Sequence, residues 1–149
     1  MENKNQNQSQ QPIILPPAYT KVTPLESFSD PKYGNVTWHT LFSAPRTTTA
    51  DLCAGIAVCP TEAGHLCAHR HIQPEIYHIL EGEGEVTIDG EKSRVNAGAT
   101  VFIPGDAEHG IVNTGKGQLR WFYVFAVNSF EEVVYRFSKD ENEKPKAKL

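Results

Sequence analysis

The chain has 149 residues, a net charge of −4 and 39% apolar residues, values that fit one folded domain with polar ends. This mildly acidic composition argues against nucleic acid as a partner, because nucleic-acid binding needs a basic patch. No run of about 18 apolar residues is present, so we expect no membrane span. The amino terminus lacks the apolar segment of a secretory signal, which predicts an intracellular, cytoplasmic protein with reduced cysteines.

The two ends of the chain are polar. Residues 1–11 are mostly Asn, Gln, Lys and Ser, and residues 139–149 are mostly charged. Neither stretch has enough apolar surface to offset the entropy of ordering it, so we predict disordered tails on a single domain that spans residues 12–138. The chain ends in Ala147-Lys148-Leu149, which resembles the Ser-Lys-Leu peroxisomal address and predicts a peroxisomal location if the source is eukaryotic.

Between the tails, short apolar runs alternate with turn signals. In chain order, the predicted strands cover residues 36–43, 52–58, 66–71, 76–80, 85–88, 93–95, 100–103, 111–113 and 118–127. Residues 130–137 form either a strand or a short helix, and Asp89-Gly90 is a strong signal for a two-residue hairpin. Many short strands separated by Gly and Pro turns predict an antiparallel sandwich or barrel.

Side chains that ligate metals gather in the middle of this pattern. His69 and His71 are two residues apart in a predicted strand, so both imidazoles project to the same face. Glu75 follows four residues later, and His109 lies further on, so a carboxylate and a third imidazole could converge on the pair. Neutral imidazole suits several transition metals, and one carboxylate leaves coordination positions open for water or substrate.

These residues lie in two motifs that resemble those of the cupin family. The first, over residues 64–82, is Gly64-x4-His69-x-His71-x3-Glu75-x6-Gly82, and the second, over residues 98–113, is Gly98-x5-Pro104-x4-His109-x3-Asn113. The resemblance implies an all-β cupin double-stranded β-helix, a small jelly-roll barrel. It also implies that one divalent transition metal ion (Fe, Mn, Ni or Zn) is held by His69, His71, Glu75 and His109.

The chain departs from the usual cupin motifs at two turns. The spacing from Gly64 to His69 is one residue shorter than the usual form, and Asp106 stands where the second motif has glycine. Both departures lie in turns, so they affect the expected loop geometry and leave the ligand set unchanged. Cys67 and His65 share strand parity with His69, so we expect both side chains to line the barrel.

Within the cupins, the chain resembles the short dimethylsulfoniopropionate lyases. The resemblance lies in Tyr33-Gly34-Asn35-Val36-x-Trp38, Glu75-Ile76-Tyr77, Gly105-Asp106-Ala107-Glu108-His109 and Phe130-Glu131-Glu132-Val133. In those enzymes a metal-bound tyrosine removes a proton next to a carboxylate and the β-substituent leaves. Tyr77 matches that tyrosine and shares parity with Glu75; the alternative is a packing tyrosine with its hydroxyl at the rim.

We therefore expect a metal-dependent enzyme that acts on a small carboxylate-bearing substrate by lyase or decarboxylase chemistry. In this reading Tyr77 or Glu75 moves the proton. An Fe(II)-dependent dioxygenase and a non-catalytic metal-binding or small-molecule-binding module are the alternatives. We also predict a homodimer, because an open barrel leaves strand edges and the stretch 12–17 is too apolar for a free tail. That stretch is expected to add a strand to the partner or to lie on it.

Overall fold

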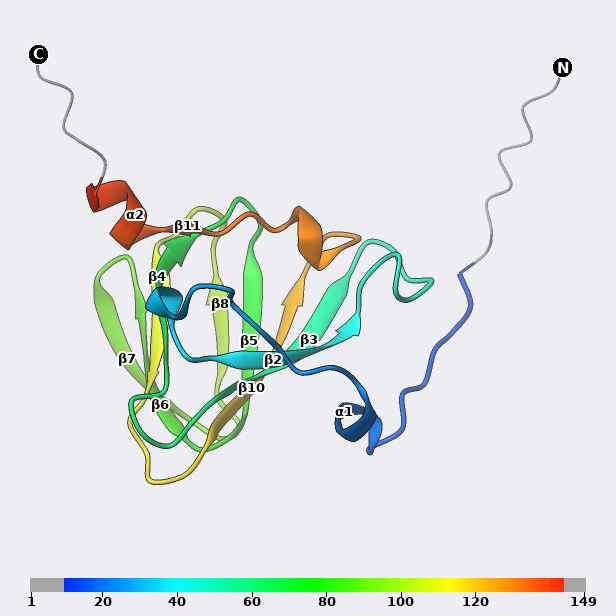
Figure 1. Ribbon diagram of the computed structural model, residues 1–149, viewed down its shortest axis with the longest axis horizontal. Helices are drawn as coiled ribbons and strands as arrows, with labels where there is room; N and C mark the ends of the chain where they lie inside the picture. Colours follow the sequence, from blue (N-terminus) through cyan, green and yellow to red (C-terminus); the bar gives the residue numbers. More distant parts are fainter. Residues whose placement is uncertain (1–9, 144–149) are drawn as a thin grey trace, which may run out of the picture.

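In the computed structural model, residues 10–143 form eleven strands in two antiparallel sheets that enclose a barrel (Figure 1). The six-stranded sheet has the order β1 (Glu26–Ser27), β2 (Thr37–Phe42), β3 (Cys53–Cys59), β10 (Leu119–Phe125), β5 (Glu75–Glu81) and β8 (Thr100–Ile103). The five-stranded sheet has the order β11 (Arg136–Phe137), β4 (His65–Arg70), β9 (His109–Asn113), β6 (Glu83–Ile88) and β7 (Glu91–Asn96). This arrangement confirms the predicted all-β jelly-roll barrel.

Short helical segments lie outside the sheets, at α1 (Tyr19–Val22), η1 (Pro31–Tyr33), η2 (Phe130–Glu132) and α2 (Ser138–Glu143). The segment 130–137, for which the sequence left strand and helix open, holds both η2 and β11. Most of the two predicted disordered tails, with the carboxyl-terminal triplet Ala147-Lys148-Leu149, lies outside the described residues. The part of the second tail that is described, residues 139–143, is helical and belongs to α2.

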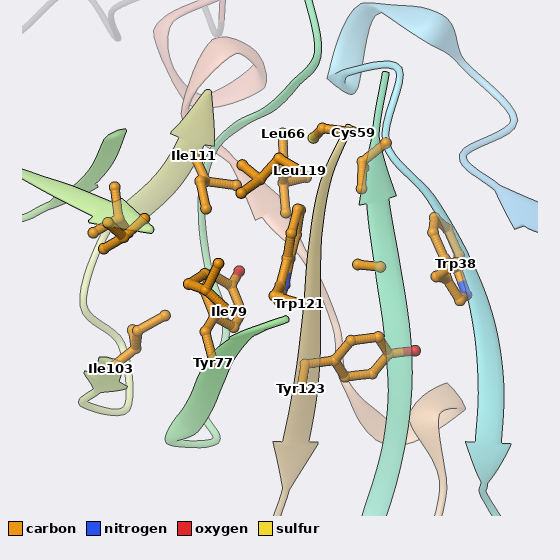
Figure 2. Close-up of a cluster of buried hydrophobic side chains, with 14 of the residues drawn as sticks. Trp38, Cys59, Leu66, Tyr77, Ile79, Ile103, Ile111, Leu119, Trp121 and Tyr123 are labelled. Carbon is orange, nitrogen blue, oxygen red and sulfur yellow. The ribbon is translucent and has the colours of Figure 1, made fainter. Parts of the chain in front are cut away.

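Residues that alternate along β10 fill the barrel. Leu119, Trp121, Tyr123 and Phe125 are buried, while the residues between them are half-buried. Because β10 pairs with β3 on one side and β5 on the other, its side chains occupy the centre of the core. Figure 2 shows Trp121 beside Tyr77 of β5, with ring centroids 5.4 Å apart. Side chains thus fill the interior, as expected for a barrel of this size.

The predicted hairpin at Asp89-Gly90 joins β6 to β7. Ile88 pairs with Glu91 across the turn, and Asp89 and Gly90 both have positive φ, at 48° and 85°. A two-residue hairpin of the primed type needs positive φ at both positions, and its twist matches that of the flanking strands. The sequence signal and the backbone therefore agree at this turn.

The β4 strand contains an irregularity that reverses its side-chain alternation. Its register with β9 shifts between Leu66 and His69, and both of these residues are buried although they are three apart. An extra residue in a strand turns the following side chains to the other face. Cys67 and His65 consequently do not share the inner face with His69, and the expectation that they line the barrel was wrong. Both are only half-buried and border a depression of about 310 Å³ outside the barrel.

The carboxyl-terminal segment lies along the edge of the five-stranded sheet. β11 pairs with β4, so that Phe137 lies opposite His69. Beyond it, Asp140 of α2 accepts a hydrogen bond of 2.6 Å from the Tyr33 hydroxyl and forms an ion pair of 3.0 Å with Lys32. These contacts explain why residues 139–143 are ordered despite their polar composition.

Candidate metal centre

Three histidines from two paired strands meet inside the barrel. His69 lies on β4, His71 follows β4 directly, and His109 begins β9 as the register partner of His69. One ring nitrogen from each lies within 4.8 Å of the other two. Their exposed fractions are only 0%, 1% and 1%. The irregularity in β4 turns His69 inward, and the β4–β9 pairing brings His109 beside it.

A backbone carbonyl orients each imidazole. The Nδ1 atoms of the three rings lie 2.8, 2.8 and 2.9 Å from the carbonyl oxygens of Cys67, Gln73 and Ala107, in that order. A carbonyl oxygen only accepts hydrogen bonds, so each Nδ1 carries the ring hydrogen and donates it. Nε2 is therefore the nitrogen of each ring that is available to a metal ion. Metal-ligating histidines typically have this arrangement, because the backbone bond fixes both the tautomer and the ring orientation.

Glu75 brings a carboxylate to two of these nitrogens. Its Oε2 lies 3.1 Å from Nε2 of His71 and 3.3 Å from Nε2 of His109, and its side chain is 3% exposed. Both contacts bring the same carboxylate oxygen within hydrogen-bond distance of a ring nitrogen. Within residues 10–143, the buried Nε2 of His69 has no hydrogen-bond partner at all. One cation bound between the three rings and Glu75 would give each of these groups a partner.

The charge state of His69 also suits a cation. Burial, followed by the neighbouring His109, lowers the pKa of His69 well below its ordinary value. The ring is therefore neutral at physiological pH, which is the form that binds a metal ion. Three imidazoles and one carboxylate form a donor set that fits Fe, Mn, Ni or Zn. The residues present thus fit a divalent transition metal, as the sequence predicted.

A small cavity adjoins the centre. Its volume is about 20 Å³, which is room for about one water molecule. Its lining includes Glu75 and is otherwise formed by apolar and aromatic side chains: Phe28, Val36, Trp38, Ala57, Leu66, Tyr77, Trp121, Tyr123, Phe130 and Tyr135. Glu75 therefore lies at the border of a small chamber whose other walls are mostly aromatic.

Tyr77 faces this chamber, as its parity with Glu75 predicted. The side chain is 1% exposed, and its ring centroid lies 6.3 Å from that of His109. Burial, followed by the charge of Glu75, raises the pKa of Tyr77 well above its ordinary value. Without a nearby positive charge the phenol therefore stays protonated. Tyr77 also packs in the core, against Trp121, as the alternative of a packing tyrosine has it, but its side chain is not exposed at a rim.

Tyr135 is the residue of the site that the sequence reasoning missed. It lies between η2 and β11, where its ring stacks on that of His69 at 4.6 Å and 28° and lies 5.4 Å from that of His71. Burial, followed by the charge of Glu75, raises the pKa of its hydroxyl well above the ordinary value. The spacing of Tyr135 and Phe137, two aromatic residues of equal parity, was the signal that could have indicated an inward-facing strand.

Asp106 fulfils the backbone role of the glycine it replaces. Its φ is 62°, a left-handed conformation that Asp tolerates better than most residues. Its carbonyl accepts a hydrogen bond of 2.7 Å from Arg70, and its carboxylate forms an ion pair with Arg136 of β11. Asp106 therefore preserves the turn and adds an ion pair with the carboxyl-terminal segment.

Comparison with known proteins agrees with this architecture. Residues 58–125 match the model of the cupin domain. Over 116 residues the chain is 47% identical to dimethylsulfoniopropionate lyase DddW of Ruegeria pomeroyi, an alignment that covers 77% of this chain and 74% of that protein. An uncharacterized protein of Methanocaldococcus jannaschii is 39% identical over 64 residues, which are 43% of this chain and 51% of the relative.

Solved structures share the fold at low sequence identity. The polyketide cyclase RemF of Streptomyces resistomycificus aligns with a TM-score of 0.67 and 19% identity, over 84% of this chain and 86% of that one. A structure reported with the DMSP lyases RdDddP and RnDddQII aligns with a TM-score of 0.66 and 15% identity, over 81% and 65% of the two chains.

The chain belongs to the cupin family, and it is a homologue of DddW. Within residues 10–143, no helix has the length and apolar character needed to cross a membrane.

Proposed function

We propose that this protein is a metal-dependent lyase that cleaves small β-substituted carboxylates of the dimethylsulfoniopropionate type. The observation that carries the proposal is a buried set of metal-fitting ligands beside Tyr77, in a chain that is 47% identical to DddW. The ion would be held by His69, His71, Glu75 and His109. Once bound, it supplies a Lewis acid that stabilises negative charge as it develops on the substrate carboxylate.

The proposed reaction is an elimination that needs a base and no oxidant. The base removes a proton from the carbon next to the carboxylate, and the electron pair of that C–H bond forms the carbon–carbon double bond. The C–S bond breaks with its electrons remaining on sulfur. A sulfonium substrate thus yields an unsaturated carboxylate, a neutral thioether and a proton, so atoms and charge balance.

Tyr77 is the proposed base. Its ring lines the same chamber as Glu75, and its buried hydroxyl is held in the protonated form when no cation is near. A divalent charge in the adjacent ligand set favours the phenolate and brings the pKa down toward neutrality. Because burial keeps Tyr77 protonated when no ion is bound, its reactivity as a base would depend on metal binding.

The chamber suits a substrate that carries a positive group. Its walls include the rings of Phe28, Trp38, Phe130 and Tyr135, whose faces attract cations such as sulfonium or quaternary ammonium. No Lys or Arg lies among its described lining residues, so no fixed cation is available for a second carboxylate. A cationic leaving group therefore fits better than a dicarboxylate such as oxalate, which favours the lyase over the decarboxylase alternative.

Replacing Tyr77 by Phe tests the proposed reaction. With dimethylsulfoniopropionate as the substrate, the metal-loaded wild-type protein should release thioether and acrylate. Tyr77→Phe should lower kcat by roughly 10²-fold or more, the usual scale for a general base, with unchanged metal content. Tyr19→Phe, which changes a tyrosine on α1 far from the chamber, is the matched control and should keep full turnover.

Two outcomes would contradict parts of this proposal separately. Near-wild-type turnover in Tyr77→Phe would exclude the tyrosine base and transfer the role to Glu75 or a metal-bound hydroxide. No product from any sulfonium carboxylate, together with oxygen uptake by the Fe(II)-loaded protein, would exclude the lyase and establish the dioxygenase alternative.

A further inference from the structure

The inner face of β3 carries small side chains, unlike the neighbouring strand β10, whose inward residues are large. The inward residues of β3 are Cys53, Gly55, Ala57 and Cys59. Ala57 is the smallest of the residues that line the chamber beside Glu75. At this position, therefore, a larger side chain would take up space that a ligand could occupy.

Ala57 lies between two tryptophans in one row across the six-stranded sheet. It pairs with Trp38 of β2 on one side and with Trp121 of β10 on the other. Directly opposite residues project to the same face of a sheet, and all three side chains are buried. Figure 2 shows Trp38 and Trp121 on either side of β3. Because both indoles also line the chamber, a single methyl group forms the wall between two aromatic side chains.

The recess at Ala57 is separated from the metal centre by one strand. Glu75 and Tyr77 belong to β5, and β10 lies between β5 and β3. Neighbouring strands are about 4.8 Å apart, so Ala57 lies about 10 Å across the sheet from β5. The chamber spans this interval, since its lining includes both Glu75 and Ala57. A substrate that is held at the ion by its carboxylate therefore directs its β-substituent across β10 and towards Ala57.

The strand that carries Ala57 is held on both of its sides. Residues Cys53 to Cys59 pair with β10, and residues Ala54 to Val58 also pair with β2. A strand with a ladder on each side opens only at a high free energy. Ala57 therefore keeps its position when a ligand enters, and the space in front of it is set by its side chain.

We propose that Ala57 determines the size of the positively charged group that the chamber accepts, and that it restricts this group to small alkyl substituents such as those of dimethylsulfonium. The inference rests on the proposed lyase function. The indole faces beside Ala57 attract the cation, while its methyl group limits the volume left for the alkyl groups. One methylene more or less in an apolar pocket changes the preference between two substrates by about 10- to 200-fold.

Tryptophan fluorescence provides the measurement. The chain has two tryptophans, and both flank Ala57, so their quenching reports a ligand that enters the chamber. The probes are β-trimethylammonio propanoate and β-triethylammonio propanoate, which carry the charges of the sulfonium substrate and differ in size. With the metal-loaded protein, Ala57→Val should weaken binding of the trimethyl probe by about 10-fold or more. Ala57→Gly should shift the affinity ratio towards the triethyl probe by about 10-fold or more.

Ala54→Val is the matched control, because it makes the same change on the same strand. Ala54 has the opposite parity from Ala57 in the regular pairing of β3 with β10, so its side chain points away from the chamber. This variant should leave the affinities for both probes unchanged. Circular dichroism and the rise in Tm on metal addition verify that each variant is folded and binds the ion. Ala57→Gly maintains the test if valine does not fit between the indoles.

An unchanged affinity ratio in the Ala57 variants would overturn the proposal, and so would failure of the wild-type protein to bind either probe. Release of thioether and acrylate from dimethylsulfoniopropionate is measured in parallel. If the ratio is unchanged while turnover persists, the size limit fails and the proposed reaction stands. If the Ala57 variants shift the ratio but no product is released, the reaction fails and the size limit stands.

Discussion

Loading the centre with a divalent metal should stabilise the barrel, and removing one histidine should abolish that effect. Nε2 of His71 and Nε2 of His109 both lie against the carboxylate of Glu75, and the buried Nε2 of His69 has no hydrogen-bond partner within residues 10–143. That unpaired nitrogen is a cost that the metal-free fold carries. A cation that binds only the folded state removes the cost and shifts the unfolding equilibrium by mass action.

The size of the effect follows from linkage. A ligand present at about 100 times its dissociation constant stabilises the native state by about 2.7 kcal/mol. For a domain of this size each kcal/mol raises Tm by roughly 2–4 °C. Addition of Fe(II), Mn(II), Ni(II) or Zn(II) to the chelator-treated protein should therefore raise Tm by about 5–10 °C.

Differential scanning calorimetry of matched histidine variants measures this shift. His69→Ala should lose most of it, because the change removes the buried Nε2 that has no other partner within residues 10–143. The quantity to compare is the rise in Tm when metal is added, because loss of the stacking on Tyr135 by itself lowers the Tm of the metal-free protein. His65→Ala is the control, because its ring bonds to the Ala63 carbonyl outside the barrel. A wild-type Tm unmoved by all four metals would refute the reasoning.

Two further predictions concern groups outside the centre. Burial raises the pKa of the Cys53 thiol to about 11 and that of Cys59 to about 12. Iodoacetamide at pH 8 should therefore modify only the half-exposed Cys67 in the native protein, as peptide mass spectrometry can show; comparable labelling of Cys53 would contradict this. Burial alone would raise the pKa of Glu26, but hydrogen bonds from Arg46 and Thr40 outweigh it and hold the pKa below 4.5. A lowered folded-state pKa stabilises the protein above the unfolded value and loses that effect as pH falls through the folded value. Glu26→Gln should thus cost about 1 kcal/mol in urea unfolding at pH 7, and an equal cost at pH 3 would be inconsistent with this account.

The sequence predicted those parts of the molecule that depend on local spacing. The Asp89-Gly90 turn has the conformation its residues favour, because a two-residue hairpin is specified by the turn itself. Glu75 and Tyr77 share the inner face because β5 alternates regularly from its first residue. The four predicted ligands also come together, although parity alone did not show how His69 would turn inward.

Features that depend on contacts between residues far apart in the chain could not be predicted from the sequence. The extra residue in β4 is invisible in the pattern, because a bulge is defined by its register with β9 and not by residue type. For this reason the sequence parity placed Cys67 on the inner face of the barrel with His69, which was wrong. Tyr135 was missed for a similar reason: its place over His69 depends on the pairing of β11 with β4. A two-residue strand leaves little periodicity to detect.

The small volume of the chamber means that part of its wall must move before the proposed substrate binds. A cavity of about 20 Å³ holds about one water, so the proposed substrate cannot enter this conformation. The strands of the barrel are held by long ladders, whereas β11 pairs over only two residues. The segment around β11 is nevertheless well packed: Phe137 stacks on Tyr33 at 3.9 Å, Tyr135 stacks on His69 at 4.6 Å, and Arg136 forms an ion pair with Asp106. Phe130 and Tyr135 of this segment line the chamber, so a ligand that displaces them must break these contacts.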